Sequence, residues 1–440
     1  MEQPFTKWKP VGIATVLHFL VDGLCLCSLS LMAAYASMKF QLALFLIYNI
    51  TAFMTQPMTG WWADCLRRRQ TMLPLATGLL AAAIVLQLAA ALWWGFLPAL
   101  AVAVAFLLGM GNSLFHVWGG RLTATLSGND MRAMGVFVSS GVLGLTVGFL
   151  YPSWYLLAGM LLFMLPGIIL LSRTQVAFAE VCTPPSPPLP KPTGWMWFWL
   201  LFILTFVLLR SFMGEVVSAG LDKPPGLLLL LAVTAMAGKA GGGWLAQGLG
   251  ISHAIVACVG IAAACMMWRG TEVIPLLPIV LGVFAINLTM PMTLHLSNRL
   301  LPHREGLSFG LLAAVLVPGY LLAKGVLLSP DHRFMLSALL LTIAIEVGML
   351  MLMGERRRGV LAGAVAVNIL TNVPLNIFLL TYGYSAGRLV AGELLVLVGE
   401  MLWYFMFVHQ WRRAAIYSLL CNATSFLAGI LIQYLIIYSL

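Results

Sequence analysis

Apolar segments about as long as a transmembrane helix follow one another along almost the whole chain, separated by short polar loops. A bilayer core of about 30 Å is crossed by about 20 apolar residues in helical conformation. The pattern therefore predicts fifteen transmembrane helices. Their approximate ranges are 11–36, 41–63, 72–93, 96–119, 133–152, 154–172, 195–218, 226–248, 251–268, 273–296, 305–325, 334–353, 360–380, 386–407 and 414–437.

One long polar interruption divides the first twelve of these helices into two groups of six. It contains six prolines between positions 184 and 192, and proline cannot continue a helix, so an extended linker is expected. We therefore predict four parts. They are an N-terminal six-helix bundle (1–172), a proline-rich cytosolic linker (173–194), a second six-helix bundle (195–355) and a three-helix transmembrane extension (356–440).

Composition leads to the same fold class. Of the 440 residues, 61% are hydrophobic and 9% are charged, whereas soluble domains have about 45–50% and about 25%. An all-α integral membrane protein is therefore expected, which excludes soluble enzymes, nucleic-acid-binding proteins and secreted disulfide scaffolds. The first apolar segment is also longer than the apolar part of a signal peptide, about 7–15 residues, so we expect it to remain as a helix.

The 24 Lys and Arg residues orient the predicted helices. With the N-terminus in the cytosol, sixteen of them fall in cytosolic segments, six in external segments and two within helices. Because cytosolic loops of membrane proteins are enriched in positive charge, this distribution predicts a multi-pass protein of the cell membrane with a cytosolic N-terminus. An odd number of helices then puts the C-terminus outside. The net charge of +10 has this origin and does not indicate a nucleic-acid partner.

A motif follows the second predicted helix. Residues 60–69 read Gly-Trp-Trp-Ala-Asp-Cys-Leu-Arg-Arg-Arg and resemble the loop motif G-x-x-x-D-R-x-G-R-R of the major facilitator superfamily, at the position where that family has it. Cys65 departs from the basic residue of the motif. The resemblance implies a gate in which Gly60 allows close helix approach, while Asp64 and Arg68 form a charge latch that breaks as two bundles rock. A plain cluster of cytosolic arginines is the alternative.

Five further segments resemble the fosmidomycin-resistance branch of this superfamily: 18–22, 55–60, 109–116, 209–211 and 287–291. The resemblance covers about residues 10–350 and implies a twelve-helix core of two six-helix bundles that exports small drugs by proton exchange. Val117 departs from it, since that branch usually has proline there. The loop at 243–250 also lacks the acid and the arginine cluster of the motif, which leaves the substrate open. No family resemblance covers the three-helix extension.

Ionisable side chains inside the predicted helices are candidates for function, because each costs at least about 2.5–3.5 kcal/mol at the bilayer centre. His18 and Asp22 are four residues apart and share one helix face. We expect Asp22 to carry a coupling proton and His18 to tune or relay it, since imidazole titrates near neutral pH. Glu215 is a third candidate for proton coupling. A purely structural hydrogen bond between His18 and Asp22 is the alternative.

Arg210 lies midway along the seventh predicted helix. Arginine stays charged and binds carboxylates or phosphates through two donors. Arg210 can therefore bind an anionic substrate or pair with Asp22 or Glu215, and the sequence favours neither. The other polar residues expected to line the substrate cavity are His116, Asn112, Asn49, Gln56 and Asn287.

The last four predicted helices contain further polar groups. Glu346 of the twelfth is expected to form a structural ion pair with Lys239 of the eighth. Polar stripes in the three-helix extension should face one another, because contact with lipid would be costly. They form a predicted C-terminal polar cluster of Asn368, Asn372, Asn376, Glu393, Glu400 and Asn422. This cluster either holds the helices together or provides an accessory proton or cation site.

These features predict a secondary active transporter that moves a small organic compound, anionic if Arg210 binds it, by alternating access and proton-coupled export. The expected partners are the substrate, protons and the lipid bilayer. We expect no catalytic residues, no cofactor and no metal, and no Walker A motif indicates use of ATP. The alternatives are uptake or lipid-related transport, or a membrane sensor or scaffold that uses the C-terminal carboxylates.

Overall fold

The computed structural model describes the chain except for residues 1–4, 67–70, 95–97, 180–193, 218–222, 269–275, 329–341, 344, 384 and 440. Regular structure in the described residues is helical, as the sequence predicts. The chain forms two compact units. Unit 1 comprises Met1–Leu189 and Met213–Val317, and unit 2 comprises Pro190–Phe212 and Pro318–Leu440.

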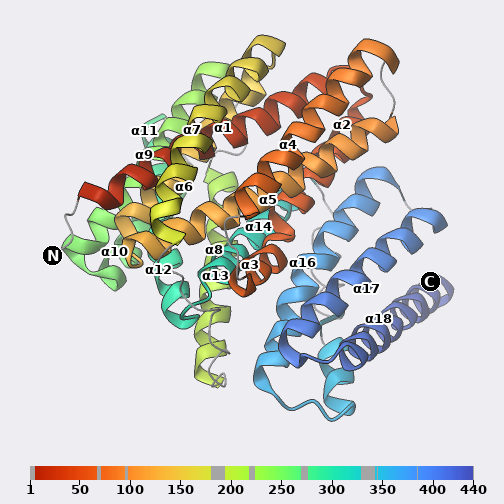
Figure 1. Cartoon of the computed structure of the whole chain (residues 1–440). Helices are drawn as coiled ribbons and strands as arrows, with labels where there is room; N and C mark the ends of the chain where they lie inside the picture. The colour runs from red at the N-terminus through yellow and green to blue at the C-terminus, as the bar shows by residue number, and fades with distance from the viewer. Residues whose placement is uncertain are drawn as a thin grey trace. The chain divides into compact units, whose positions relative to one another are not determined.

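The helices of unit 1 come from both halves of the sequence (Figure 1). They are α1 (Phe5–Ala33), α2 (Met38–Asn49), α3 (Gln56–Cys65), α4 (Met72–Ala89), α5 (Pro98–Ser127), α6 (Met131–Leu150), α7 (Trp154–Ala179), α9 (Pro225–Leu249), α10 (Ile251–Trp268), α11 (Leu276–Leu288), α12 (Met290–Leu300) and α13 (Glu305–Ala314), with π-helical turns η1 (Ile50–Met54) and η3 (Ala90–Trp94). Two helices have residues in both units, α8 (Gly194–Val217) and α14 (Leu316–Leu328).

Twelve helical segments among the described residues are long and apolar enough to cross a membrane. A helix suits this environment because it satisfies its own backbone hydrogen bonds in lipid. Some of these segments are not α-helical throughout: α2, η1 and α3 form one span, Met38–Cys65, whose π-helical turn comes just before Pro57. Of the fifteen predicted helices, 334–353 lies partly outside the described residues, so the predicted total stays open.

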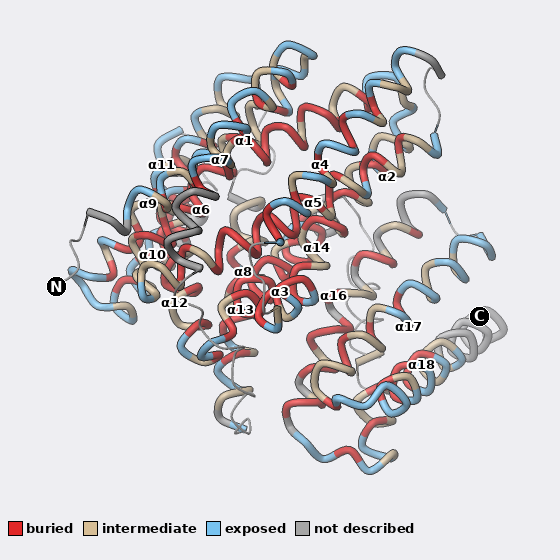
Figure 2. Tube along the Cα trace, in the orientation of Figure 1, coloured by how far each residue is buried: buried red, intermediate tan, exposed pale blue. Residues whose placement is uncertain are grey.

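Glycines let α6 pack closely on α1. A side chain at Gly144 would meet the backbone carbonyl of Phe19, and one at Gly148 would meet that of Gly23. Small residues allow membrane helices to approach at backbone distance. α5 lies beside the same helices, and its residues 111–121 are buried without interruption (Figure 2). This packing places the polar residues of α1 and α5 in the interior of unit 1.

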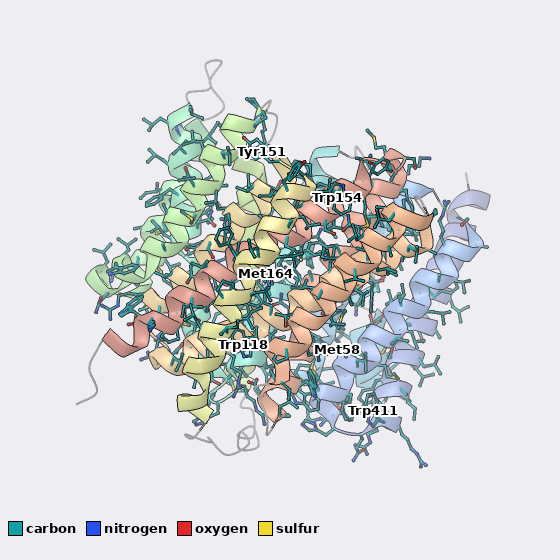
Figure 3. The ribbon with its side chains drawn as sticks, turned by 45° about the horizontal axis from the view of Figure 1, so that its top comes forward. Met58, Trp118, Tyr151, Trp154, Met164 and Trp411 are labelled. Carbon is teal, nitrogen blue, oxygen red and sulfur yellow. The ribbon has the colours of Figure 1, made fainter. Side chains whose placement is uncertain are left out.

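Aromatic residues mark one end of unit 1. Tyr151 and Trp154, 52% and 40% exposed, lie at the turn between α6 and α7. Figure 3 shows both close to one end of the helices, with Trp118 and Met58 toward the other end. Exposed Tyr and Trp are typical of the membrane–water interface. We therefore place this turn at a membrane surface.

Unit 2 ends in three consecutive helices, α16 (Arg358–Tyr382), α17 (Ala386–Val408) and α18 (Trp411–Ser439). α17 packs against both of the others. Leu375, Leu379 and Val396 form an apolar core between α16 and α17. Left-handed residues at the helix ends, Gly383 and His409, allow the chain to turn sharply after α16 and α17.

The two compact units differ from the predicted domains. Residues 213–317 belong to unit 1 together with the N-terminal helices, whereas the sequence placed them in a second bundle, 195–355. The predicted boundaries at 172, 194 and 355 stay predictions. Part of the predicted linker 173–194 lies outside the described residues.

The turn that leads into α16 is held by Glu355. Its carboxylate accepts hydrogen bonds from the backbone N–H of Arg356 (3.0 Å) and of Arg357 (2.8 Å), and it pairs with Arg357 Nη2 at 2.5 Å. Tyr417 Oη of α18 donates to the same carboxylate at 3.1 Å. The hydrogen bonds from the Arg357 side chain are the main cause that lowers the pKa of Glu355 to about 2.

This lowered pKa predicts a specific loss of stability in acid. The contribution of Glu355 is fully present above the ordinary glutamate pKa of 4.5 and is lost as the pH falls from there toward about 2. In detergent near pH 6, the unfolding temperature of Glu355→Gln should be lower than that of the wild type. Below pH 4.5 it should fall less steeply than that of the wild type. Asp130→Asn is the matched control, because Asp130 also pairs with an arginine two residues later, Arg132, but is more exposed. An equal decrease of the unfolding temperature below pH 4.5 in the wild type and Glu355→Gln would contradict this prediction.

Candidate functional site

Four buried polar side chains join α1 to α5 inside unit 1. Asp22 (2% exposed) and His18 (4%) lie on α1. Asn112 (0%) and His116 (6%) lie on α5. Within each pair the residues are four apart, so each helix directs both side chains to the same side. We call these four residues the Asp22 cluster.

The carboxylate of Asp22 is the centre of the cluster. Its Oδ2 atom lies 3.3 Å from His18 Nε2, and its Oδ1 atom lies 3.6 Å from His116 Nε2. Asn112 Nδ2 donates a hydrogen bond to Oδ1 at 2.7 Å. The two imidazoles also meet, with 2.8 Å between His18 Nε2 and His116 Nε2. The sequence predicted the His18–Asp22 pair but assigned Asn112 and His116 to the substrate cavity.

The contacts of the two imidazoles determine how many hydrogens they carry. His18 Nδ1 lies 2.7 Å from the carbonyl of Phe137, and His116 Nδ1 lies 3.0 Å from the carbonyl of Asn112. A carbonyl oxygen only accepts, so both Nδ1 atoms must carry hydrogen. The hydrogen bond between the two Nε2 atoms needs one hydrogen more. In this arrangement the pair would hold three hydrogens and carry one positive charge beside the Asp22 carboxylate.

Helix α6 covers the cluster. The Phe137 ring stacks on His18 with 4.8 Å between ring centroids, and Phe137 is fully buried. At Gly141 a side chain would collide with the Asp22 carboxylate and the His18 ring. Only a glycine backbone fits this close to the charged groups. The apolar cover lowers the local dielectric and so strengthens the interactions between these charges.

The geometry of the cluster fits a shared proton better than a metal ion. One ligand atom from each of His18, Asp22 and His116 lies within 4.8 Å of the others, so one small cation could contact all three. Zinc at bond lengths of about 2.0–2.1 Å holds neighbouring ligand atoms about 3.3 Å apart. The 2.8 Å between the two Nε2 atoms is shorter and is a hydrogen-bond distance.

Asp64, the acid of the gate motif, is fully buried where α3 meets α13. Its Oδ1 accepts from Arg121 Nε at 3.0 Å and from the backbone N–H of Gly306 at 3.0 Å, and its Oδ2 accepts from the N–H of Leu307 at 2.8 Å. The first N–H groups of a helix have no partner within the helix and attract negative charge. Asp64 thus caps the start of α13, and we call this contact the Asp64 latch.

A pair of glycines allows the Asp64 latch to close. A side chain at Gly60 would meet the carbonyl of Gly306. The sequence predicted Gly60, Asp64 and Arg68 as gate residues. Arg68 lies outside the described residues, so its part stays a prediction, and Arg121 forms an ion pair with Asp64. Arg121 was counted in the sequence only as one of the cytosolic positive charges. No motif in the loop itself indicated it, since it lies on a different helix.

Three predicted cavity residues bond within their own helices. Asn49 Nδ2 donates to the carbonyl of Phe45, Gln56 Nε2 to that of Ala52 and Asn287 Nδ2 to that of Val283, at 2.7–2.8 Å. Gln56 is fully buried and its Oε1 has no hydrogen-bond partner among the described residues. Contact of these residues with substrate stays a prediction.

Arg210 is buried in the part of α8 that belongs to unit 2. It is 7% exposed, and its Nη1 has no hydrogen-bond partner among the described residues. A buried charge without full pairing is costly, so such a group is a candidate for a ligand. Glu215, further along α8, is only partly buried, and its part in proton coupling stays a prediction.

Unit 2 holds a second buried polar network. Glu400 of α17 is fully buried and accepts hydrogen bonds from Thr371 Oγ1 of α16 (3.2 Å) and Asn422 Nδ2 of α18 (2.5 Å). One carboxylate therefore links the three C-terminal helices. Polar contacts between membrane helices contribute about 0.6–2 kcal/mol each, which is enough to specify their packing.

Glu346 belongs to the same network. It is fully buried, and its carboxylate accepts from Asn368 Nδ2 at 2.6 Å and from Ser425 Oγ at 3.0 Å. The sequence did not place Glu346 with the C-terminal helices; its ion pair with Lys239 stays a prediction. Asn372 Nδ2 extends the network by donating to Asn368 Oδ1 at 2.9 Å.

The rest of the predicted C-terminal polar cluster lies at the edge of this network. Asn376 Nδ2 donates to the backbone carbonyl of Asn372 at 2.9 Å. Glu393 is half-buried on α17. These contacts bring most of the predicted polar stripe together, and they leave open whether the network only holds the helices or also binds an ion.

Comparison with solved structures identifies the fold of the chain. The major facilitator superfamily transporter FucP, in its outward conformation, has a TM-score of 0.51 and 13% sequence identity over 86% of this chain and 99% of that one. A variant of the E. coli fucose:proton symporter FucP gives 0.50 and 12% over 86% and 98%. The chain has the major-facilitator fold. A bacterial homologue of the iron transporter ferroportin matches with a TM-score of 0.47 and 15% identity over 85% and 99%.

No family model and no curated protein matches the chain. Identities of 12–13% show a shared fold alone. The two matches with TM-scores of 0.50 and 0.51 are described as a transporter and a symporter. The likeness to the fosmidomycin-resistance branch and the status of the last three helices as an extension are not decided by these matches.

Proposed function

We propose that the protein is a secondary active transporter that exports a small organic compound in exchange for protons by alternating access. The major-facilitator fold supports the transport class. The sequence segments that resemble the fosmidomycin-resistance branch support export of a small drug-like compound. The Asp22 cluster supports proton coupling.

The shared hydrogen of the Asp22 cluster carries the proposal of proton coupling. It can pass between His18 Nε2 and His116 Nε2, which are 2.8 Å apart, and Asp22 lies within 3.6 Å of both rings. A proton that reaches Asp22 neutralises its carboxylate and removes the charge that stabilises the histidine pair. The pair then releases its extra proton more readily. Proton entry on one side and release on the other can thus follow from small movements of α1 and α5.

The Asp64 latch provides the gate in this proposal. It ties α3 and α5, from the first half of the sequence, to α13, from the second half. The positive-inside pattern puts this contact at the cytosolic end. Access from the cytosol then requires the latch to open, and the closed latch corresponds to a site that faces outward.

Arg210 is the reason for proposing that the substrate is an anion. We expect a carboxylate, phosphate or phosphonate group to bind the Nη1 that has no partner among the described residues. Charge-assisted hydrogen bonds are worth about 1.5–3 kcal/mol, so Arg210→Gln should raise the KM for an anionic substrate about 10- to 150-fold and change kcat little. Arg388→Gln, an exposed arginine on α17, is the control. An unchanged KM in Arg210→Gln would assign Arg210 a structural role.

A compound-sensitivity array tests the proposed function as a whole. Cells that express the protein, and cells that do not, are grown with a panel of small organic compounds that includes phosphonates and organic acids. Export predicts resistance to at least one compound class. Greater sensitivity instead of resistance would indicate uptake. Equal growth of both strains, together with no saturable flux in vesicles, would contradict transport of this class of compound.

A further inference from the structure

An open pocket of about 750 Å³ lies at one end of unit 2. The turn before α16 forms one wall and the first turns of α18 form the other. Both walls belong to segments that the positive-inside pattern assigns to the cytosolic side. The pocket therefore lies where these helices leave the cytosolic face of the membrane.

The pocket is positively charged. Arg356, Arg357 and Arg413 line it, and the acid beside them, Glu355, is already engaged by Arg357 at 2.5 Å. Among the described residues, no carboxylate lies within ion-pair distance of Arg356 or Arg413. Arg356 Nη1 donates to a backbone carbonyl at 3.0 Å, which leaves its charge uncompensated. The guanidinium groups of Arg356 and Arg413 can thus hold one anion from both sides of the pocket.

An apolar surface continues from this charged pocket along α18. Ile416 and Leu420, one turn apart, line the pocket and are 50% and 38% exposed. Trp411 (Figure 3), at the start of the same helix, is 52% exposed. It stacks on Phe405 with 3.9 Å between ring centroids. An exposed Trp beside arginines is typical of the headgroup region of a membrane.

We propose that this pocket binds the headgroup of an anionic phospholipid, with its phosphate between Arg356 and Arg413 and its acyl chains along Ile416 and Leu420. A basic pocket at the cytosolic ends of transmembrane helices suits such a lipid, because the arginines attract the negative phosphate and the apolar surface contacts the acyl chains. A free phosphate ion would use the arginines but not the apolar surface. This inference rests on the membrane fold and does not depend on the proposed transport activity.

Lipid binding to the full-length protein in neutral detergent micelles tests the proposal. The probe is fluorescent phosphatidylglycerol, with phosphatidylcholine and inorganic phosphate as competitors. The wild type should bind phosphatidylglycerol and lose little of it to either competitor. Each arginine near an anionic lipid contributes about fivefold in affinity, so the Arg356→Gln, Arg413→Gln double variant should bind about 25-fold more weakly. Arg413→Lys retains the charge and should bind close to wild type.

Arg388→Gln is the matched control. It also removes an exposed arginine from the C-terminal helices, but at the other end of α17, and should leave phosphatidylglycerol binding unchanged. Three results would overturn the proposal. The first is equal binding of phosphatidylcholine and phosphatidylglycerol. The second is displacement of the probe by inorganic phosphate at the concentration at which phosphatidylglycerol binds. The third is an equal loss of binding in Arg388→Gln and the double variant.

Discussion

Asp22→Asn is expected to abolish accumulation of substrate driven by a pH gradient, while the protein still folds and still exchanges substrate down its own gradient. One pH unit supplies about 1.4 kcal/mol per proton, which supports about tenfold accumulation at one proton per substrate. Asparagine occupies the same volume and still accepts from Asn112, but it cannot take a proton. The cluster then has no carboxylate to hold the positive charge of His18 and His116.

Flux into proteoliposomes with an imposed pH gradient measures this effect. Asp130→Asn is the matched control, because Asp130 caps α6 by accepting from the backbone N–H of Arg132 at 2.9 Å and asparagine caps helices equally well. It should accumulate substrate as the wild type does. If Asp22→Asn accumulates substrate tenfold across one pH unit, the coupling proton does not bind at Asp22.

Gly60→Ala is expected to open the Asp64 latch. The added methyl group would meet the carbonyl of Gly306, and neither backbone can move without parting α3 from α13. Overpacking of this kind costs about 1–3 kcal/mol, which shifts the equilibrium toward the open latch by about 5- to 150-fold. Ser308 follows the latch on α13 and is fully buried, so a maleimide should modify the Ser308→Cys variant faster when Gly60→Ala is also present.

Gly78→Ala is the control for this experiment. A side chain at Gly78 on α4 would meet nothing within 4 Å, so the Gly78→Ala change should leave the labelling rate of Ser308→Cys unaltered. Net transport should also fall in Gly60→Ala, since a gate that stays open cannot alternate. Equal labelling rates with and without Gly60→Ala would show that this contact is not a moving gate.

Much of the fold follows from the sequence because lipid imposes a simple rule on it. Each long apolar run has to become a helix, and the helices α5, α6 and α17 lie where the runs at 96–119, 133–152 and 386–407 predicted them. The grouping of helices into compact units does not follow from this rule. It depends on which helix faces pack together. The sequence does not indicate which helix packs against a face such as that of Gly144 and Gly148.

The site was predictable where its residues are close in sequence. His18 and Asp22 are four apart, so their contact follows from helix geometry. Contacts between distant helices left no such signal. The Asp64–Arg121 pair joins residues 57 apart, and the His18–His116 contact joins residues 98 apart. The sequence also gave no signal for the hydrogen bonds that Glu346 accepts from Asn368 of α16 and Ser425 of α18.

Proton counting tests the central claim most directly. Proteoliposomes that contain a pH-sensitive dye receive a substrate gradient and no pH gradient. The account predicts that the wild type moves protons in the direction opposite to the substrate and in a fixed ratio to it. A protonophore should remove the pH change. Asp22→Asn should move substrate without protons. Substrate movement by the wild type with no change of internal pH would contradict proton coupling at the Asp22 cluster.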